Sequence, residues 1–147
     1  MKKMILSVVV MLFIGVSSTF ANRTENVNQK AQNSFSKDFA AAKEVKWEAT
    51  KEFSKVTFTL NAQVMTAYYN TNGEMIAMTR NIVSGQLPIS LLTSLKKDYS
   101  EFWISDLFEM AAENSTTYYV TLENADTQLV LRSDSNGNWE LFKKERK

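Results

Sequence analysis

Apolar and polar residues alternate along two long stretches of the chain, and a helical spacing precedes each stretch. Ahead of the first stretch, Phe35 and Phe39 lie four residues apart, which places both rings on one face of a helix. From Val45 onward the period becomes two, as expected for strands with one buried face. The alternating runs cover residues 45–49, 56–60, 63–70 and 74–80. The first half of the chain is therefore predicted to form one helix followed by four antiparallel strands.

The same order of elements follows a connector over residues 81–87. Pro88 suits the first turn of a helix, where a missing N–H removes no hydrogen bond. Large apolar residues then recur every four positions from Leu87 to Tyr99. Strand-like runs follow over residues 104–113, 116–124, 127–134 and 138–144. The second half is therefore predicted to repeat the helix-plus-four-strand unit.

Two similar turns mark the repeat. The stretch "NTNGEM" at 70–75 returns as "DSNGNW" at 134–139, a spacing of 64 residues. Asn-Gly predicts a two-residue type I′ hairpin turn, because both central residues of that turn need a positive φ. The spacing between Phe39 and Tyr99 is only 60 residues, so the second copy is expected to carry extra residues around Trp103.

A single unit of this kind cannot bury the apolar face of four strands beneath one short helix. Two units side by side can form one antiparallel sheet with both helices packed on one face. The predicted fold is therefore α+β, with tandem units over about residues 35–84 and 85–147 and with the other sheet face open. The polar residues 22–34 are predicted to form a flexible leader ahead of the single domain at 35–147.

The start of the chain predicts export. Two lysines precede an apolar run from Ile5 to Val16, and small residues then lead to Ala21. This order is typical of a signal peptide, here residues 1–21, with cleavage after Ala21. The apolar run has 12 residues, whereas a membrane-spanning helix needs roughly 20, so an uncleaved anchor is the weaker alternative. We expect a periplasmic or secreted protein with no stable membrane span after cleavage.

Charge and cysteine content narrow the possible partners. The expected mature chain of 126 residues has 15 Lys and Arg (17 less Lys2 and Lys3) against 16 Asp and Glu, a formal charge of −1. Without a basic block, the sequence offers no electrostatic basis for nucleic-acid binding. An exported domain without cysteine has no disulfides to stabilise it. This composition favours a bacterial periplasm over a eukaryotic secretory pathway.

Short motifs appear in a recognisable order after the helix that ends near Phe39. They are "AKEVKWE" at 42–48, an aromatic strand, an Asn-Gly hairpin and a helix led by Leu-Pro. In this order the chain resembles the PepSY-like, β-lactamase-inhibitor-like periplasmic proteins of Bacteroidetes, over about residues 30–145. Members often have proline directly after the phenylalanine, where this chain has Ala40. The resemblance implies a tandem α+β inhibitor-like fold, export, and binding without catalysis, and it supplies no active residues.

Catalytic chemistry has few candidate side chains. The chain has no His and no Cys, which excludes Ser-His-Asp and Cys-His machinery and any zinc site built on imidazole or thiolate ligands. The remaining candidates are carboxylate pairs, Glu44 with Glu48 and Asp106 with Glu109. Glu44 and Glu48 are expected on strand edges or polar strand faces, where a solvated carboxylate is poorly suited to acid–base catalysis. We therefore predict that the protein is not an enzyme.

Oxygen-bearing side chains alternate through "DSNGNWE", which resembles the beginning of a calcium-binding loop. They are Asp134, Asn136, Asn138 and Glu140. The run of ligands stops early, and hairpin turns favour the same residue types for backbone reasons. A plain turn is therefore the main interpretation, and a calcium-responsive or small-ligand sensor is the alternative function.

The open sheet face is the leading candidate for function. If Met65, Ala67 and Tyr69 face the helices, the next strand position faces outward, and the same holds in the second unit. The residues predicted to share this exposed face are Tyr68, Tyr119, Thr66, Thr121 and Arg132. Tyrosine and arginine on a flat surface are typical of protein-binding patches, although cross-strand tyrosine and threonine pairs also occur on ordinary sheet surfaces. The predicted function is a non-catalytic binding module for an unidentified periplasmic protein or peptide.

Overall fold

The computed structural model describes residues 27–147, so the predicted signal peptide and its cleavage after Ala21 lie outside the described residues. Two helices, one 3-10 turn and eight strands make up the described chain. In order they are α2 (Gln29–Asp38), β1 (Lys43–Ala49), β2 (Phe53–Leu60), β3 (Gln63–Asn70), β4 (Met75–Asn81), the 3-10 turn (Ser84–Gln86), α3 (Ile89–Asp98), β5 (Trp103–Ala112), β6 (Ser115–Glu123), β7 (Thr127–Ser133) and β8 (Trp139–Arg146).

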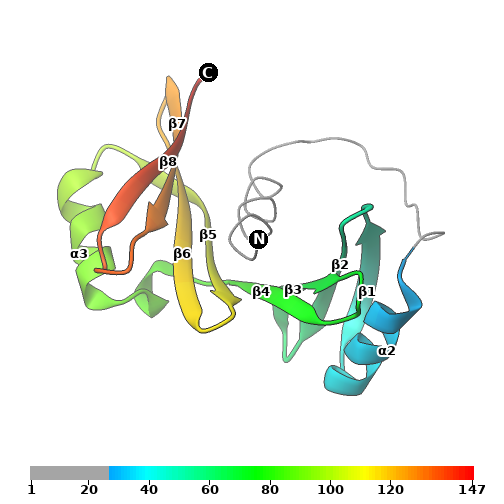
Figure 1. Cartoon of the computed structure of the whole chain (residues 1–147). Coiled ribbons are helices and arrows are strands. Elements are labelled where there is room, and N and C mark those ends of the chain that lie inside the picture. The colour runs from blue at the N-terminus through cyan, green and yellow to red at the C-terminus, as the bar shows by residue number, and fades with distance from the viewer. Residues whose placement is uncertain (1–26) are drawn as a thin grey trace.

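The eight strands form one antiparallel sheet in the order β1 to β8, so every strand pairs with its neighbour in sequence. The sheet bends between β4 and β5, and the two helices lie on its outer side, α2 against the first four strands and α3 against the last four (Figure 1). The predicted α+β fold, with tandem helix-plus-four-strand units in a single sheet, is confirmed.

The first helix begins earlier than the sequence suggested. Asn28 caps α2, and its side-chain oxygen accepts a hydrogen bond from the N–H of Lys30 at 2.8 Å. Ala31 and Phe35, four residues apart, are both buried against the sheet. The predicted flexible leader over 22–34 is therefore wrong for residues 29–34, which form the first part of the helix.

An aromatic core holds α2 against the first half of the sheet. The Phe35 ring meets Phe58 edge-on at 5.0 Å between ring centres and Trp47 at 5.4 Å. Such edge-to-face pairs add to the stability that burial of the rings supplies. The buried members of this cluster are Ala31, Phe35, Val56, Phe58, Ala67 and Tyr69.

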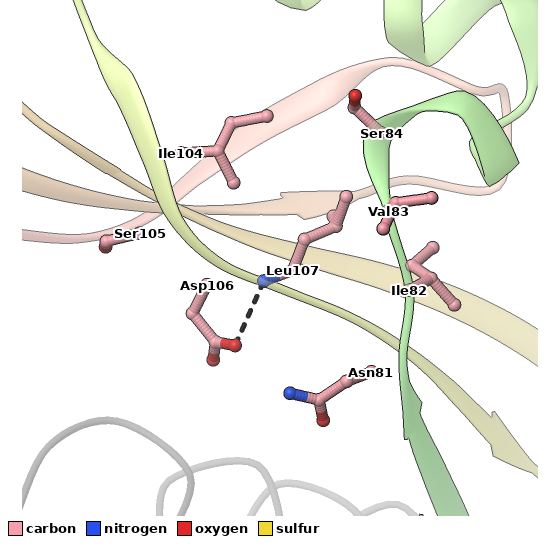
Figure 2. A pocket seen from close by; sticks show the side chains of 8 residues that line it. All are labelled: Asn81, Ile82, Val83, Ser84, Ile104, Ser105, Asp106 and Leu107. Atoms are coloured by element: carbon pink, nitrogen blue, oxygen red, sulfur yellow. Dashed lines mark hydrogen bonds between the residues drawn. The ribbon is translucent and has the colours of Figure 1, made fainter. Parts of the chain in front are cut away.

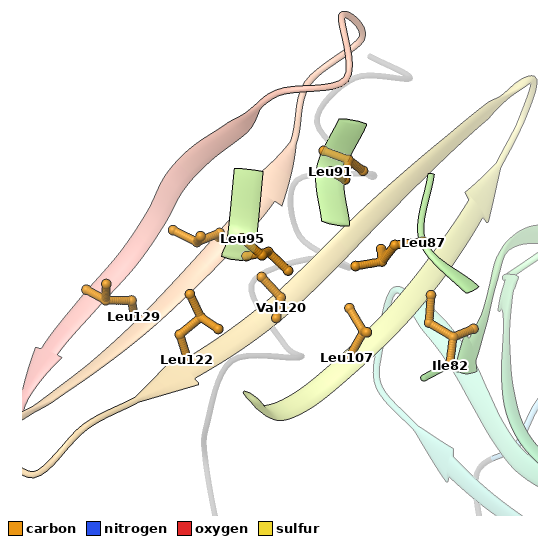
Figure 3. Packing of buried hydrophobic residues seen from close by; sticks show 9 residues of the cluster. Ile82, Leu87, Leu91, Leu95, Leu107, Val120, Leu122 and Leu129 are labelled. Atoms are coloured by element: carbon orange, nitrogen blue, oxygen red, sulfur yellow. The ribbon is translucent and has the colours of Figure 1, made fainter. Parts of the chain in front are cut away.

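An aliphatic core holds α3 against the second half (Figure 3). Leu91 and Leu95 point from the helix onto β5, β6 and β7, where they meet leucine and valine side chains. The buried members of this cluster are Ile82, Leu87, Leu91, Leu95, Leu107, Val120, Leu122, Leu129 and Leu131. No aromatic residue belongs to this buried set, although Trp139, Tyr99 and Phe102 pack at its margin.

The prediction of type I′ turns at Asn-Gly is wrong. Only glycine has a positive φ in each loop, 81° at Gly73 and 77° at Gly137. The N–H of Gly73 donates to the carbonyl of Asn70 at 3.0 Å, and the N–H of Asn70 donates to the carbonyl of Glu74 at 2.9 Å. These bonds define a three-residue loop in which glycine follows an ordinary turn. The conformation is preferred because the Asn70 side chain accepts two further N–H bonds, which stabilise the turn locally.

Positive φ at two consecutive residues occurs instead at Asn61 and Ala62, with values of 51° and 63°. These two residues join Leu60 to Gln63, which pair directly across β2 and β3. This loop therefore has the type I′ geometry that the sequence pattern assigned to Asn-Gly.

The extra residues expected around Trp103 are confirmed. Strand β5 has ten residues, whereas its counterpart β1 has seven. The register of β5 against β6 shifts between Ile104 and Asp106, so one residue there is left without a partner. A bulge of this kind bends a strand and changes which face its side chains occupy.

Candidate binding face

The strand register places the five predicted binding residues on the sheet face opposite the helices. Thr66 pairs with Thr57 and Thr79, and Tyr68 lies two positions along β3 on the same face. In the second half, Tyr119 pairs with both Phe108 and Arg132. We call this surface the rear face. Its aromatic members are Phe53, Tyr68, Phe108, Tyr119 and Phe142.

Tyr68 is on the predicted face but is not exposed. Its relative accessibility is 1%, and its ring packs 5.9 Å from that of Phe53. Ala77 and Ala112 complete this cluster, so it joins β4 of the first half to β5 of the second. The rear face was predicted to be solvent-exposed, whereas its apolar residues form a buried cluster of their own.

Tyr119 is likewise buried, at 3% relative accessibility, which corrects the expectation that it is exposed. Its ring stacks on Phe108 at 5.1 Å with 13° between the planes, and the ring of Phe142 meets it edge-on at 5.9 Å. Arg132 lies over the Phe142 ring at 5.5 Å and forms an ion pair with Glu140 at 3.1 Å. A guanidinium group over an aromatic ring forms a cation–π contact, and arginine and aromatic residues dominate the binding energy of many protein interfaces.

Threonines lie on the same face as these two aromatic clusters. The hydroxyls of Thr57 and Thr66 lie 3.3 Å apart across β2 and β3. Thr66 and Thr121 are half-buried, whereas Thr79 is buried. The rear face therefore combines apolar rings with a row of hydroxyls that can donate and accept hydrogen bonds.

The tyrosines on this face are neutral at ordinary pH. Desolvation raises the pKa of Tyr68 far above its usual value, and the charge of Glu48 adds to the shift. Desolvation also raises the pKa of Tyr119, while the charge of Arg132 and a hydrogen bond from it offset part of the shift. The two buried phenols are therefore uncharged, and Arg132 and Glu140 supply the charge nearby.

Sequence reasoning missed three of the rings. Phe53 was read as part of a break between strands, yet it begins β2 and pairs with Asn70. Phe108 was predictable from the strand period, because it lies two positions from both Asp106 and Met110 on β5 and therefore faces the same side of the sheet. Phe142 could not, because the register of β8 shifts between Val130 and Leu131 of its partner strand.

The oxygens of the calcium candidate are engaged within the turn. One carboxylate oxygen of Asp134 accepts the N–H groups of Asn136 and Asn138, at 2.9 and 2.8 Å. These backbone hydrogen bonds lower the pKa of Asp134. The carboxylate of Glu140 binds Arg132 instead of facing the loop. Within residues 27–147, no three or more carboxylates are grouped to hold a metal ion.

Asn70 shows that this arrangement belongs to the turn. It occupies the position of Asp134 in the first half, and its amide oxygen accepts the N–H groups of Asn72 and Glu74 at 2.9 and 3.0 Å. An amide and a carboxylate therefore perform the same structural task in the two halves. The shared contact explains why "NTNGEM" and "DSNGNW" resemble one another.

The carboxylate pairs considered for catalysis do not form pairs. Glu44 accepts a hydrogen bond from the hydroxyl of Thr59 at 2.7 Å, whereas Glu48 lies 3.4 Å from the Lys55 ammonium group. Asp106 and Glu109 are three residues apart on β5 and so point to opposite faces of the sheet. Glu109 binds the Arg80 guanidinium group at 2.9 Å on the helix side.

Comparison with known proteins identifies the fold. No protein-family model matches the chain, and no curated protein matches it. Among solved structures, it resembles a BLIP-like protein of Bacteroides fragilis, at 18% identity and a TM-score of 0.67 over 82% of this chain and 86% of that one.

Two further solved structures give the same result. A predicted periplasmic protein of Bacteroides eggerthii matches at 10% identity and a TM-score of 0.72, over 82% of this chain and 89% of that one. A DUF2874 family protein of Bacteroides ovatus matches at 14% identity and a TM-score of 0.70, over 82% of this chain and 88% of that one. At these identities the likeness concerns the fold, and the chain has a BLIP-like fold of two helices on an eight-stranded antiparallel sheet.

Proposed function

We propose that this chain is a non-catalytic exported module that binds a protein or peptide partner through the rear face. The observation that carries the proposal is the gathering of five aromatic rings and Arg132 on the one sheet face that no described helix covers. Aromatic residues and arginine contribute most of the binding energy at protein interfaces. The half-buried threonines on this face, Thr66 and Thr121, offer hydrogen bonds to an extended or flat partner.

Absence of catalysis is supported by side-chain chemistry. The sequence contains no His and no Cys. Of the candidate carboxylates, Glu44 accepts a bond from Thr59, Glu48 is paired with Lys55, and Asp106 and Glu109 point to opposite faces of the sheet. A general acid and base must both reach the same reacting group. The geometry offers no such pair among the candidates that the sequence suggested.

Export is supported by the sequence of residues 1–21 and by one solved neighbour, the predicted periplasmic protein of Bacteroides eggerthii. In the part of the chain that the structure describes, neither helix is long and apolar enough to cross a membrane. The partner would then be another protein or peptide of the same compartment. The PepSY-like resemblance agrees with this proposal.

The proposal is tested by altering the half-buried positions of the rear face and leaving its buried rings intact. In Thr66→Arg and Thr121→Arg, a long charged side chain stands on the rear face, whereas Ser36→Arg places the same side chain on the exposed side of α2. Each variant is first checked for a cooperative thermal melt. Tagged protein then captures partners from periplasmic extract of the native host, and quantitative mass spectrometry measures recovery.

We expect the two threonine variants to lose a partner that wild type and Ser36→Arg both retain. Equal recovery of every partner by all four proteins would exclude the rear face as the binding surface. Loss of the partner in Ser36→Arg alone would indicate that the interface lies on the helix side of the sheet.

A further inference from the structure

The ladder between β4 and β5 is short, and β5 continues beyond it. The last strand pair is Asn81 with Phe108, and one further backbone bond joins the N–H of Ile82 to the carbonyl of Leu107 at 3.0 Å. The chain then leaves β4 for the 3-10 turn Ser84–Gln86. Residues 103–106 pair with β6 on one side only. Within residues 27–147, no backbone hydrogen bond reaches their other side.

A recess of about 420 Å³ lies where the two strands separate (Figure 2). Ile104 and Val83 are 41% and 67% exposed, and they lie on one side of the β5 ribbon, whereas Asp106 lies on the other. The residues that line the recess are Asn81, Ile82, Val83, Ser84, Ile104, Ser105, Asp106 and Leu107. The recess therefore presents apolar side chains on one side of an unpaired strand and a carboxylate on the other.

Of the described residues, Asp106 is the single ionisable one that lines this recess. Its Oδ1 atom accepts the N–H of Leu107 at 3.0 Å, where the β4 ladder has ended. Among residues 27–147, no Lys or Arg forms an ion pair with it. The residue as a whole is exposed, yet desolvation raises the pKa of its carboxyl, partly offset by the bond from Leu107. A basic side chain of a partner could therefore bind this carboxylate without displacing a Lys or Arg of residues 27–147.

The two outer edges of the sheet carry lysines, whereas this internal edge carries a bulge and Asp106 but no lysine. Strand β1 carries Lys43 and Lys46 with a register shift between them, and β8 carries Lys143 and Lys144. Lysines on an edge strand oppose pairing with another chain. Residues 103–106 contain no lysine or arginine and expose Trp103 and Ile104.

We propose that the unpaired start of β5 accepts an extended segment of a partner polypeptide, in which a basic side chain meets Asp106 and apolar side chains on the alternate positions meet Ile104 and Val83. Strand addition of this kind takes affinity from main-chain hydrogen bonds and specificity from alternate side chains. At the far end of the edge, Lys147 lies over the Trp103 ring at 5.1 Å and binds Glu123 at 2.6 Å. The basic residue of the segment therefore belongs at Asp106 and not beside Trp103.

Asp106 pairs with Thr121 of the rear face, but the proposed site uses the unpaired β5 backbone and none of the rear-face rings, so the two proposals can fail separately. The probe is the blocked pentapeptide Thr-Val-Lys-Val-Thr, added at millimolar concentration to the isotope-labelled domain, with backbone amide NMR shifts as the readout. A second peptide replaces lysine with norleucine, which keeps the alkyl chain and removes the charge. The variant Asp106→Asn keeps an oxygen that accepts the Leu107 N–H, and Asp98→Asn is the matched control on α3.

We expect the lysine peptide to shift the amides of residues 103–107 and 82–84. Replacing lysine with norleucine, or Asp106 with Asn, should each weaken binding by about tenfold, because each removes the same charge-assisted contact. Asp98→Asn should bind as wild type does. Failure of the lysine peptide to bind, shifts confined to β1 or β8, or equal affinity for wild type and Asp106→Asn would each overturn the proposal.

Discussion

The two halves of the sheet have the same order of elements but bury different side chains beneath their helices. Under α2 the core is aromatic, with Phe35, Trp47 and Phe58 in edge-on contact. Under α3 it is aliphatic, with Leu91 and Leu95 packed on valine and leucine. The two halves thus fill the space between helix and sheet with different kinds of side chain, aromatic in the first and aliphatic in the second. The part that is retained is the hydrogen-bonded turn, which depends on backbone geometry.

The halves also differ in how the turn meets the helix. In the first half the approach is direct, because a Cβ atom at Gly73 would lie 2.6 Å from that of Lys30, and the Ser34 hydroxyl donates to the Gly73 carbonyl at 2.7 Å. In the second half a side chain makes the contact, because the indole N–H of Trp139 donates to the carbonyl of Leu91 at 2.9 Å. The same turn is therefore held by glycine in one half and by tryptophan in the other.

The largest effect is expected at the two glycines. Gly73→Ala forces a side chain into the left-handed region and against the backbone of α2, and it should destabilise the protein by about 4 kcal/mol. Gly137→Ala suffers mainly the backbone strain, because its nearest neighbour is the Ser90 hydroxyl at 3.2 Å, and it should cost about 1.5 kcal/mol. Urea unfolding of both variants measures the difference. Equal losses would show that the direct approach in the first half contributes nothing.

A smaller effect is expected at Trp139. Trp139→Phe removes the bond to the Leu91 carbonyl and part of a packed indole, and it should cost about 2 kcal/mol. Met75 begins β4 as Trp139 begins β8, but it is 45% exposed, so Met75→Ala should cost about 0.5 kcal/mol. Chemical denaturation of the pair tests this asymmetry. A larger loss at Met75 would reverse the comparison.

Two tyrosines sharpen the comparison further. The Tyr69 hydroxyl is buried without a hydrogen-bond partner among the described residues, so Tyr69→Phe should leave the protein equally stable or up to about 1 kcal/mol more stable. Tyr118 has a hydrogen bond to Glu109, so Tyr118→Phe should lose about 1 kcal/mol. The free energies of unfolding at neutral pH are the measurement. Loss of stability in Tyr69→Phe would indicate a partner for that hydroxyl.

The pH dependence of stability follows from the same residue. Desolvation, aided by the charge of Asp38, raises the pKa of Tyr69 from its usual value of 10.0 to about 12. The unfolded state therefore ionises first, so this contribution to stability is complete below pH 10 and is lost as the pH rises through 12. Tyr69→Phe should flatten the alkaline decline. An unchanged slope of the urea midpoint against pH, between about pH 10 and 12, would contradict this assignment.

The smallest expected effect is the response to calcium. Because the turn N–H groups occupy the Asp134 carboxylate and Arg132 binds Glu140, we expect Trp139 fluorescence to stay unchanged during a calcium titration to millimolar concentration. The Asp134→Asn variant, which imitates Asn70 of the first half, should fold as wild type does. A saturable fluorescence change that this variant abolishes would favour the calcium-sensor alternative.

The sequence predicted the parts of this fold that depend on periodicity. Leu91 and Leu95 follow the helical period, and Tyr68 and Tyr119 were placed on the correct face by the strand period. Their burial was not predictable, because it depends on Phe53 and Phe142, whose positions follow from a strand start and a register shift. The turn type was mistaken because Asn-Gly fits two loop geometries, and side-chain bonds from Asn70 select between them.

Binding through the rear face is the central claim, and site-specific photocrosslinking tests it most directly. A photoreactive amino acid is placed at Thr66, Thr121 or Arg132 on the rear face, and at Ser36 or Thr93 on the exposed sides of the helices, in cells of the native host. We predict one adduct of the same mass from all three rear-face positions and none from the helix positions. An adduct from Ser36 or Thr93, with none from the rear face, would contradict the account.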